Sequence, residues 1–255
     1  MLDTSLAQHV LAAMLSLAPP GHSAYSRTVV PDCDKTCQAT RVCADPGTIC
    51  DAPSFSRYER AYTRQETAQE GLRRYAGIAE AIADVAENLP EWRFDRRELA
   101  DVITTHMFFE SGLRADVQAG VGPAAYGDCS SADPRTGARV KEGTPGARRY
   151  CRAGCLMQIN VQMLRVVSPN EKLALRDIVG TSPERTRTCI TMGARVIAKT
   201  RGSAKRAGDS WVLATMQNYG GLFAQARTST YAKVKKAPPT LPDSVLAQLG
   251  IRPDT

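Results

Sequence analysis

Residues 108–113 have the sequence Phe-Phe-Glu-Ser-Gly-Leu, in which one acid ends an apolar run and small residues follow at once. The preceding residues, 94–109, predict a helix, because Asp95 and Glu98 have the spacing of a capping box at its start. Gly112 is a residue at which such a helix can end. The sequence therefore predicts that the acid, Glu110, lies in the last turn of a helix.

One face of this predicted helix carries both its apolar residues and the acid. Four residues follow one another at steps of four, three and four and so share that face: Leu99, Ile103, His106 and Glu110. We expect the inward carboxyl to keep its proton, because burial disfavours the charged form, and a carboxyl protonated at neutral pH suits general acid catalysis. We expect His106 to be neutral and packed, because a charged imidazole would lower the pKa of Glu110.

The composition is that of a folded protein with an excess of positive charge. The chain has 255 residues, of which 43% are hydrophobic, and a formal net charge of +7. This charge suits an anionic partner such as an acidic cell-wall polymer, although a basic surface with no specific partner is an equal alternative. We expect no nucleic acid partner, because the sequence contains no nucleic-acid-binding motif. No stretch is long and apolar enough to predict a stable membrane span.

Eight cysteines occur in two groups, with one residue apart from both. The first group is Cys33, Cys37, Cys43 and Cys50, the second is Cys129, Cys151 and Cys155, and Cys189 stands alone. An even count favours disulfides formed in an oxidising compartment, so we expect a periplasmic or secreted protein. A zinc site is disfavoured, because the first group lacks Cys-x-x-Cys spacing and no histidine lies near either group. We expect no metal and no cofactor, and the pairing of the cysteines stays open.

The chain divides by composition into four segments. Residues 1–28 indicate a targeting or disordered segment, because they contain a short apolar run. A signal peptide would have Lys or Arg before such a run, and here there is none. Residues 29–57 are rich in Cys, Asp and Pro and predict a loop-rich extension held by disulfides. Residues 58–232 carry the periodic segments. Residues 233–255 are a basic, proline-rich tail that has room for a short helix over 241–249.

Nearly every periodic segment within residues 58–232 predicts a helix. Besides the helix that ends at Glu110, we expect helices over residues 58–89, 169–177, 184–200 and 209–219. Residues 118–153 have no helical or strand period and are dense in Gly, Pro, Asp, Ser and Arg, so they predict a long loop. Cys129 and Cys151 can tether this loop, and Cys155 can pair with either of them or with Cys189.

Three short elements follow one another along the chain: Glu110-Ser111-Gly112-Leu113, Gly154-Cys-Leu-Met-Gln-Ile-Asn160 and Asn218-Tyr-Gly-Gly221. Their order resembles that of the lytic transglycosylase and goose-type lysozyme superfamily, which has a Glu-Ser pair at a helix end, then Gly-Leu-Met-Gln, then Ala-Tyr-Asn-x-Gly. The resemblance covers about residues 95–225. It implies a mainly α, lysozyme-like helical domain, here with a long disulfide-tethered loop and a Cys-rich N-terminal extension.

The resemblance also implies an activity, the cleavage of the β-1,4 bond between N-acetylmuramic acid and N-acetylglucosamine in peptidoglycan. Glu110 matches the catalytic acid of the family. In lytic transglycosylases this residue then acts as a base and deprotonates the C6 hydroxyl of the sugar, which yields a 1,6-anhydro product. The expected partner is the glycan strand of peptidoglycan, and we expect the protein to act as a monomer.

Two other functions are compatible with the same motifs. A hydrolase similar to the goose-type enzymes would need a second carboxylate in the loop, for which Asp128 and Asp133 are the candidates beside Asp116. An inverting hydrolase places its two carboxyl groups roughly 6.5–9.5 Å apart. The other alternative is a lysozyme-like module that binds glycan without cutting it, because the third element departs from the family pattern.

The remaining site residues come from the resemblance alone, position by position. The expected substrate-binding residues are Ser111, Met157, Gln158, Asn160, Asn218 and Tyr219. Gln158 matches the family residue that bonds a sugar N-acetyl group, and Met157 matches one that lies beneath a sugar ring, although a core position is as frequent for a methionine. If the third element is aligned on its Gly, Asn218 matches the family Asn and Gln217 takes the place of the Tyr; if it is aligned on Tyr219, the Asn is displaced. The family Tyr contacts the catalytic Glu, and we expect Tyr219 in that role. Cys155 replaces the usual Gly or Ala, which suggests a disulfide that supports the site.

Overall fold

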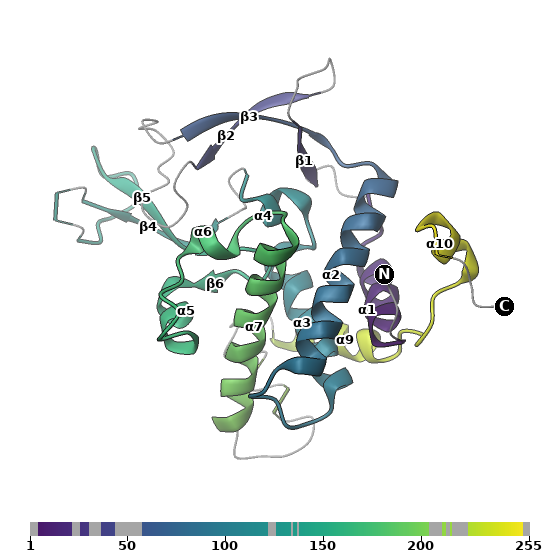
Figure 1. The fold of residues 1–255 in the computed structure, drawn as a ribbon. Helices are drawn as coiled ribbons and strands as arrows, with labels where there is room; N and C mark the ends of the chain where they lie inside the picture. The colour runs from purple at the N-terminus through teal and green to yellow at the C-terminus, as the bar shows by residue number, and fades with distance from the viewer. Residues whose placement is uncertain are drawn as a thin grey trace.

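The computed structural model describes residues 5–21, 26–30, 37–43, 58–121, 126–133, 135–136, 138–203, 211–212, 215 and 224–251. Within these residues the fold is mainly helical, with two small three-stranded sheets, which confirms the mainly α expectation. Figure 1 shows the helices gathered in one body, with one sheet above them and a β-hairpin projecting to the side. No helix in this described part is long and apolar enough to cross a membrane.

Helix α3 (Arg96–Ser111) is the centre of the helical body. It contacts α1 (Ser5–Leu17), α2 (Ala68–Asn88), α7 (Pro183–Ser203) and α9 (Ala224–Lys235). It begins as the sequence predicts, because the Asp95 side chain caps the backbone N–H of Arg97 at 2.8 Å. The capping box expected from Asp95 and Glu98 is not formed, and Glu98 accepts a hydrogen bond from the indole N–H of Trp211 at 3.2 Å. Gly112 ends the helix in the left-handed conformation, with φ of 60°.

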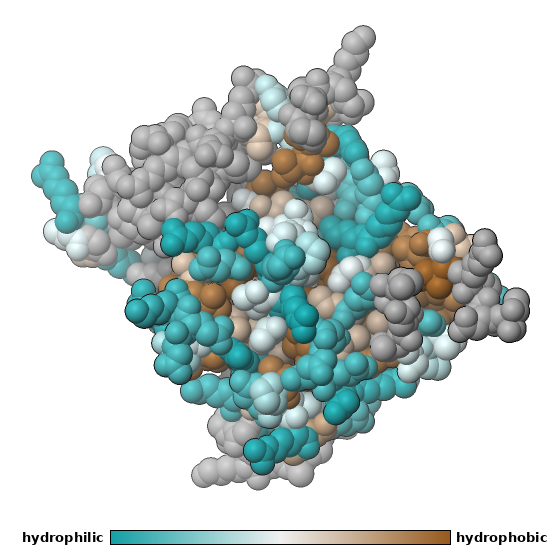
Figure 2. All heavy atoms as spheres, in the orientation of Figure 1, coloured by the Kyte–Doolittle hydropathy of each residue, from teal (hydrophilic) through white to brown (hydrophobic). Residues whose placement is uncertain are grey.

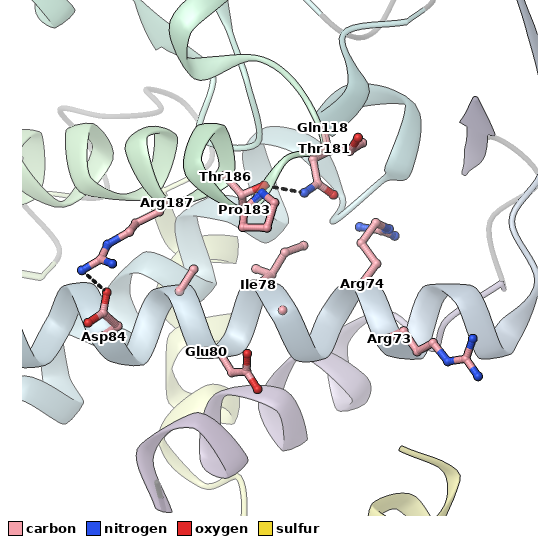
Figure 3. Close-up of a pocket in the computed structure, with 12 residues that line it drawn as sticks. Arg73, Arg74, Ile78, Glu80, Asp84, Gln118, Thr181, Pro183, Thr186 and Arg187 are labelled. Carbon is pink, nitrogen blue, oxygen red and sulfur yellow. Dashed lines mark hydrogen bonds and ion pairs between the residues drawn. The ribbon is translucent and has the colours of Figure 1, made fainter. Parts of the chain in front are cut away.

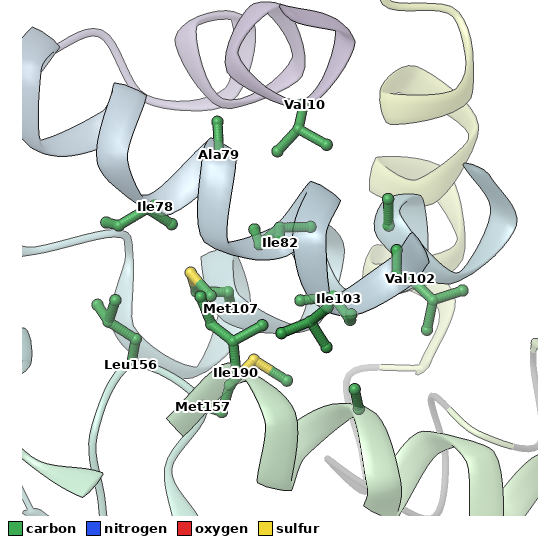
Figure 4. Close-up of a cluster of buried hydrophobic side chains, with 14 of the residues drawn as sticks. Val10, Ile78, Ala79, Ile82, Val102, Ile103, Met107, Leu156, Met157 and Ile190 are labelled. Carbon is green, nitrogen blue, oxygen red and sulfur yellow. The ribbon is translucent and has the colours of Figure 1, made fainter. Parts of the chain in front are cut away.

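Helix α1 (Ser5–Leu17) is part of the core, which differs from the targeting or disordered segment expected there. Val10 and Leu11 are fully buried, and Figure 4 shows Val10 facing Ala79 of α2. The buried side chains of His9 and Asp101 lie 2.7 Å apart and connect α1 to α3. The apolar run near the N-terminus is therefore a core helix in this fold.

Residues 58–65 form strand β3 (Tyr58–Gln65) and do not begin a helix, so the expectation of one helix over 58–89 was wrong in its first part. Helix α2 (Ala68–Asn88) starts after a capping box, in which Thr67 Oγ1 accepts from the Glu70 N–H and the Glu70 carboxylate accepts from the Thr67 N–H. Pairing on both edges stabilises β3, and such tertiary context overrides local propensity.

The first sheet has the strand order β1-β3-β2, and both neighbours of β3 run antiparallel to it. β2 (Gln38–Cys43) lies in the segment 29–57 that was expected to be loops, and β1 (Arg27–Val30) crosses the start of that segment. Strand β1 contacts the short helix α4 (Ala115–Ala119), and the Ser26 hydroxyl accepts from the Ala115 N–H at 3.1 Å. Strand β1, at the start of the Cys-rich segment, therefore packs beside the helix that follows α3 in the chain.

The second sheet occupies much of the region expected to be a long loop. β4 (Tyr126–Ala132) and β5 (Arg148–Gly154) form an antiparallel hairpin, and β6 (Ile159–Asn160) pairs with the end of β5. The hairpin is not apparent from the sequence because its strands are rich in Gly, Ser and Arg and lack alternating apolar residues. Cys129 and Cys151 are directly opposite each other in its register.

Of the remaining helices, α7 and α9 contact α3. These remaining helices are α5 (Val161–Val167), α6 (Leu175–Ile178), α7 (Pro183–Ser203), α9 (Ala224–Lys235) and α10 (Asp243–Gln248). The helix expected over 184–200 and the short one over 241–249 are confirmed. The helix expected over 169–177 is wrong in its bounds, since only its end falls within α6, and α5 and α9 were not expected. Of residues 209–219, the structure describes 211, 212 and 215, all helical.

The core lies between α1, α2, α3 and α7, and the turn before β6 adds to it. Figure 4 shows Ile82, Ile103 and Met107 meeting Met157 and Ile190 there. The face shown in Figure 2 is largely hydrophilic, with hydrophobic surface near α1 and α10. α9 crosses the expected boundary at 232, and the buried Val234, Leu241 and Leu246 pack the following segment onto the same core.

Candidate functional site

Glu110 lies in the last turn of α3, as the sequence predicts, with 18% of its side chain exposed. Its Oε1 atom accepts a hydrogen bond from Nη2 of Arg227 at 2.8 Å. Burial raises the pKa of Glu110 above its ordinary value, and the hydrogen bond and charge of Arg227 lower that pKa by less. The expected inward orientation and raised pKa of this carboxyl are therefore both present.

Arg227 is the member of the site that sequence reasoning missed. It lies on α9 and is 4% exposed. Its Nη1 atom is 3.0 Å from Nδ1 of His106, and its guanidinium carbon lies 5.2 Å from the ring centroid of Phe109. The sequence does contain a signal, because Arg227 shares the helical face of the buried Tyr231 and Val234, and a buried arginine requires a partner.

His106 is fully buried one turn before Glu110. Burial, followed by the nearby charge of Arg227, lowers the pKa of His106 to about 3. An arginine can only donate, so Nδ1 of His106 accepts from Arg227 and the proton of the neutral ring sits on Nε2. The expectation of a neutral, packed histidine agrees with this geometry.

The Leu-Met-Gln element forms the turn between β5 and β6. Met157 is fully buried, and a β-carbon added to Gly193 of α7 would lie 2.6 Å from its Cε. Met157 thus occupies the core position that the sequence left open, and does not face solvent. Gln158 is half-buried, donates to the Cys155 carbonyl at 3.3 Å and lies against Gly127 of β4.

A disulfide joins this turn to α7, between Cys155 and Cys189, whose Cα atoms are 6.2 Å apart. Cys155 has φ of 64°, an unusual conformation for a residue with a side chain. The disulfide is the support suggested for the site, and it selects Cys189 from the possible partners of Cys155. Cys37 and Cys151 are also oxidised to disulfides.

Two other expected substrate-binding residues make structural contacts. Ser111 is buried, and its hydroxyl donates to the Met107 carbonyl at 2.7 Å. The Asn160 side chain caps α5 by accepting from the Gln162 N–H at 2.8 Å. Asn218 and Tyr219 lie outside the described residues, so the expected contact of Tyr219 with Glu110 stays a prediction.

Two of the three candidate second carboxylates, Asp116 and Asp133, have hydrogen-bond partners of their own. The side chain of the third, Asp128, is not among the described residues. Asp133 accepts from the backbone N–H groups of Arg135 and Thr136 at 2.7 and 3.1 Å, and these bonds lower its pKa. Asp116 is buried and forms a two-point ion pair with Arg114 at 3.0 and 2.5 Å. Asp128 belongs to β4, and its side chain is not among those described.

A cavity of about 490 Å³ lies between α2 and the start of α7, and Figure 3 shows its lining. The lining side chains pair with one another, since Gln118 donates to Thr186 at 2.8 Å and Arg187 lies 2.5 Å from Asp84. Glu110 is not among the lining residues, so this cavity is separate from the candidate acid.

The site thus provides one carboxyl with a raised pKa that accepts a hydrogen bond from a buried arginine, and this arginine also contacts a neutral histidine; a carboxyl in this arrangement can donate a proton. Among the residues that the structure describes, no cluster of three His, Cys, Asp or Glu side chains could hold a metal ion. The chain has no match among protein-family models, curated proteins or solved structures.

Proposed function

We propose that the protein is a peptidoglycan-cleaving glycosidase with a lysozyme-like domain, and that it acts as a lytic transglycosylase on the bond between N-acetylmuramic acid and N-acetylglucosamine. The observation that carries the proposal is the position of Glu110, a carboxyl with a raised pKa in the C-terminal turn of α3. The Leu-Met-Gln turn, fixed by Cys155–Cys189, provides the second element of the motif set.

In the proposed reaction Glu110 acts first as an acid and then as a base. Its proton moves to the glycosidic oxygen as the bond from that oxygen to the anomeric carbon breaks. The C6 hydroxyl oxygen of the same sugar then bonds to the anomeric carbon, and its proton returns to Glu110. This route needs one carboxylate, and it is favoured because Asp116 and Asp133 have other partners.

The composition supports this substrate and place of action. A net charge of +7 attracts the protein to an acidic wall polymer. Disulfides persist in oxidising compartments, which favours a periplasmic or secreted location.

The variant Glu110→Gln tests the proposal. We expect it to release no soluble muropeptides from purified peptidoglycan while its circular dichroism spectrum matches the wild type. Glu87→Gln, which removes an acid from the last turn of α2, is the matched control and should keep full activity. Undiminished release by Glu110→Gln would contradict the proposal. Mass spectrometry of the products separates the alternatives, because anhydro ends indicate a transglycosylase and reducing ends indicate a hydrolase that uses a loop aspartate such as Asp128.

A glycan-binding module without catalysis is the second candidate, and the ion pair between Glu110 and Arg227 is the observation that favours it. The charge of Arg227 favours the ionised form of Glu110, which has no proton to donate. Retention of the wild-type protein on purified wall without release of fragments would support this candidate.

A further inference from the structure

Arg227 is fixed from three directions in the described structure. Its two terminal nitrogens bond Glu110 and His106 at 2.8 and 3.0 Å, and its guanidinium stacks on the Phe109 ring. Its side chain is 5% exposed. A buried guanidinium in such a setting has little freedom to turn, so the oxygen that it contacts is held in place as well.

One charged side chain among the described residues contacts Glu110. Helix α3 is contacted by α1, α2, α7 and α9, and among the described residues of these elements Arg227 is the one charged group that contacts Glu110. In the described part of the chain, the groups that contact the Arg227 guanidinium are Glu110, the neutral His106 and the Phe109 ring. The Arg227 guanidinium therefore places a cation beside this carboxyl.

The geometry also divides the work between the two carboxyl oxygens. Oε1 accepts from Arg227, whereas no described residue donates to Oε2. A proton on the carboxyl therefore belongs on Oε2, since the oxygen that already accepts from a cation is the weaker base. The transferred proton then faces away from Arg227.

We propose that Arg227 is a positioning residue for Glu110, which keeps Oε2 as the proton-carrying oxygen and stabilises the carboxylate that forms after the proton is donated. This inference rests on the proposed function, because it concerns the carboxyl that acts as acid and then as base. Arg227 lowers the pKa of Glu110 against the larger effect of burial. Burial favours the protonated acid that the first step needs, and Arg227 favours the anion that the second step needs.

The test compares Arg227→Gln and Arg227→Lys with the wild type. The pKa of Glu110 is followed by carbon-13 NMR of its side-chain carboxyl, identified as the resonance that disappears in Glu110→Gln. Removing the cation in Arg227→Gln should raise the pKa of Glu110 by about 1 to 3 pH units. Arg227→Lys keeps a charge and should change it less. Arg201→Gln is the matched control, since Arg201 also stacks on aromatic rings, Phe94 and Trp211, and it should leave this pKa unchanged.

Activity provides the second readout. In Arg227→Gln the pH at which kcat/KM declines on the alkaline side should move up with the pKa of Glu110, and Arg227→Lys should restore part of the wild-type profile. An unchanged Glu110 pKa in folded Arg227→Gln overturns the proposal. If Arg227→Gln does not fold, the pH dependence of Arg227→Lys decides. A Glu110 pKa and a kcat that differ from those of the wild type support the proposal, and identical values overturn it. A raised pKa with no muropeptide release by the wild type would instead refute the proposed function.

Discussion

A β-carbon placed on Gly193 of α7 would lie 2.6 Å from Cε and 2.9 Å from Cγ of Met157. The Leu-Met-Gln turn and α7 are therefore in contact at a point where only glycine fits. Both residues are buried, so the turn cannot move away from the helix without opening the core.

Gly193→Ala should therefore destabilise the protein by about 1–3 kcal/mol, because overpacking outweighs the gain in helix propensity. Gly77→Ala is the matched control, since it is also within a helix and its added β-carbon would meet nothing within 4 Å. The control should be stabilised by about 0.5–1 kcal/mol. Urea denaturation measures both, and a stabilised Gly193→Ala would show that Met157 does not pack as described.

The disulfide between Cys155 and Cys189 closes a segment with a sequence separation of 34 residues. Replacing both cysteines by alanine should lower the free energy of unfolding by about 3–4 kcal/mol, because the unfolded chain regains the entropy of an open loop. We also expect lower activity, since the Leu-Met-Gln turn loses its link to α7. Equal urea midpoints for the double variant and the wild type would contradict this prediction.

The buried His106 makes stability depend on pH with a defined sign. Its pKa falls from an ordinary 6.5 to about 3 in the folded protein, so the unfolded chain binds more protons between these values. The contribution of neutral His106 to the free energy of unfolding is therefore complete above the unfolded pKa and is lost as the pH falls through this window. The loss is on the order of 3 kcal/mol between pH 7 and pH 4.

His106→Gln isolates this effect, because its side-chain oxygen can still accept from Arg227 but does not titrate. The free energy of unfolding of the variant should decrease less between pH 7 and pH 4 than that of the wild type. Glu110, whose pKa is raised, titrates in both proteins and cancels in the comparison. Parallel stability curves would show that His106 is not buried in its neutral form.

The parts of the site that could be predicted from sequence depend on contacts within one helix. The periodic apolar face of α3 places Glu110 inward and makes His106 neutral, because neighbours three and four residues apart share a surface. Arg227 was missed because it meets Glu110 from 117 residues away along the chain. No local pattern specifies which acid a buried arginine contacts.

The fold, like the site, was predictable where it depends on local periodicity and not where it depends on contacts between distant segments. Helices α3 and α7 have regular apolar faces and were expected, whereas the β4–β5 hairpin and strand β3 depend on pairing between segments. Strand stability arises from cross-strand partners, and residues such as Gly, Ser and Arg give little local signal for it. The apolar run near the N-terminus was ambiguous for a related reason, since a core helix and a targeting segment share a hydrophobic composition.

A substitution in α1 distinguishes these two interpretations of the N-terminal run. Leu11 is fully buried, so Leu11→Ala should cost about 2–5 kcal/mol in the free energy of unfolding if α1 is part of the core. Ser5→Ala is the control, because Ser5 is exposed in the first turn of the same helix and its loss should be nearly neutral. Urea denaturation of the full chain gives both values. Equal midpoints for the two variants would mean that α1 does not contribute to the folded core, and mass spectrometry of the purified protein would verify that both chains retain these residues.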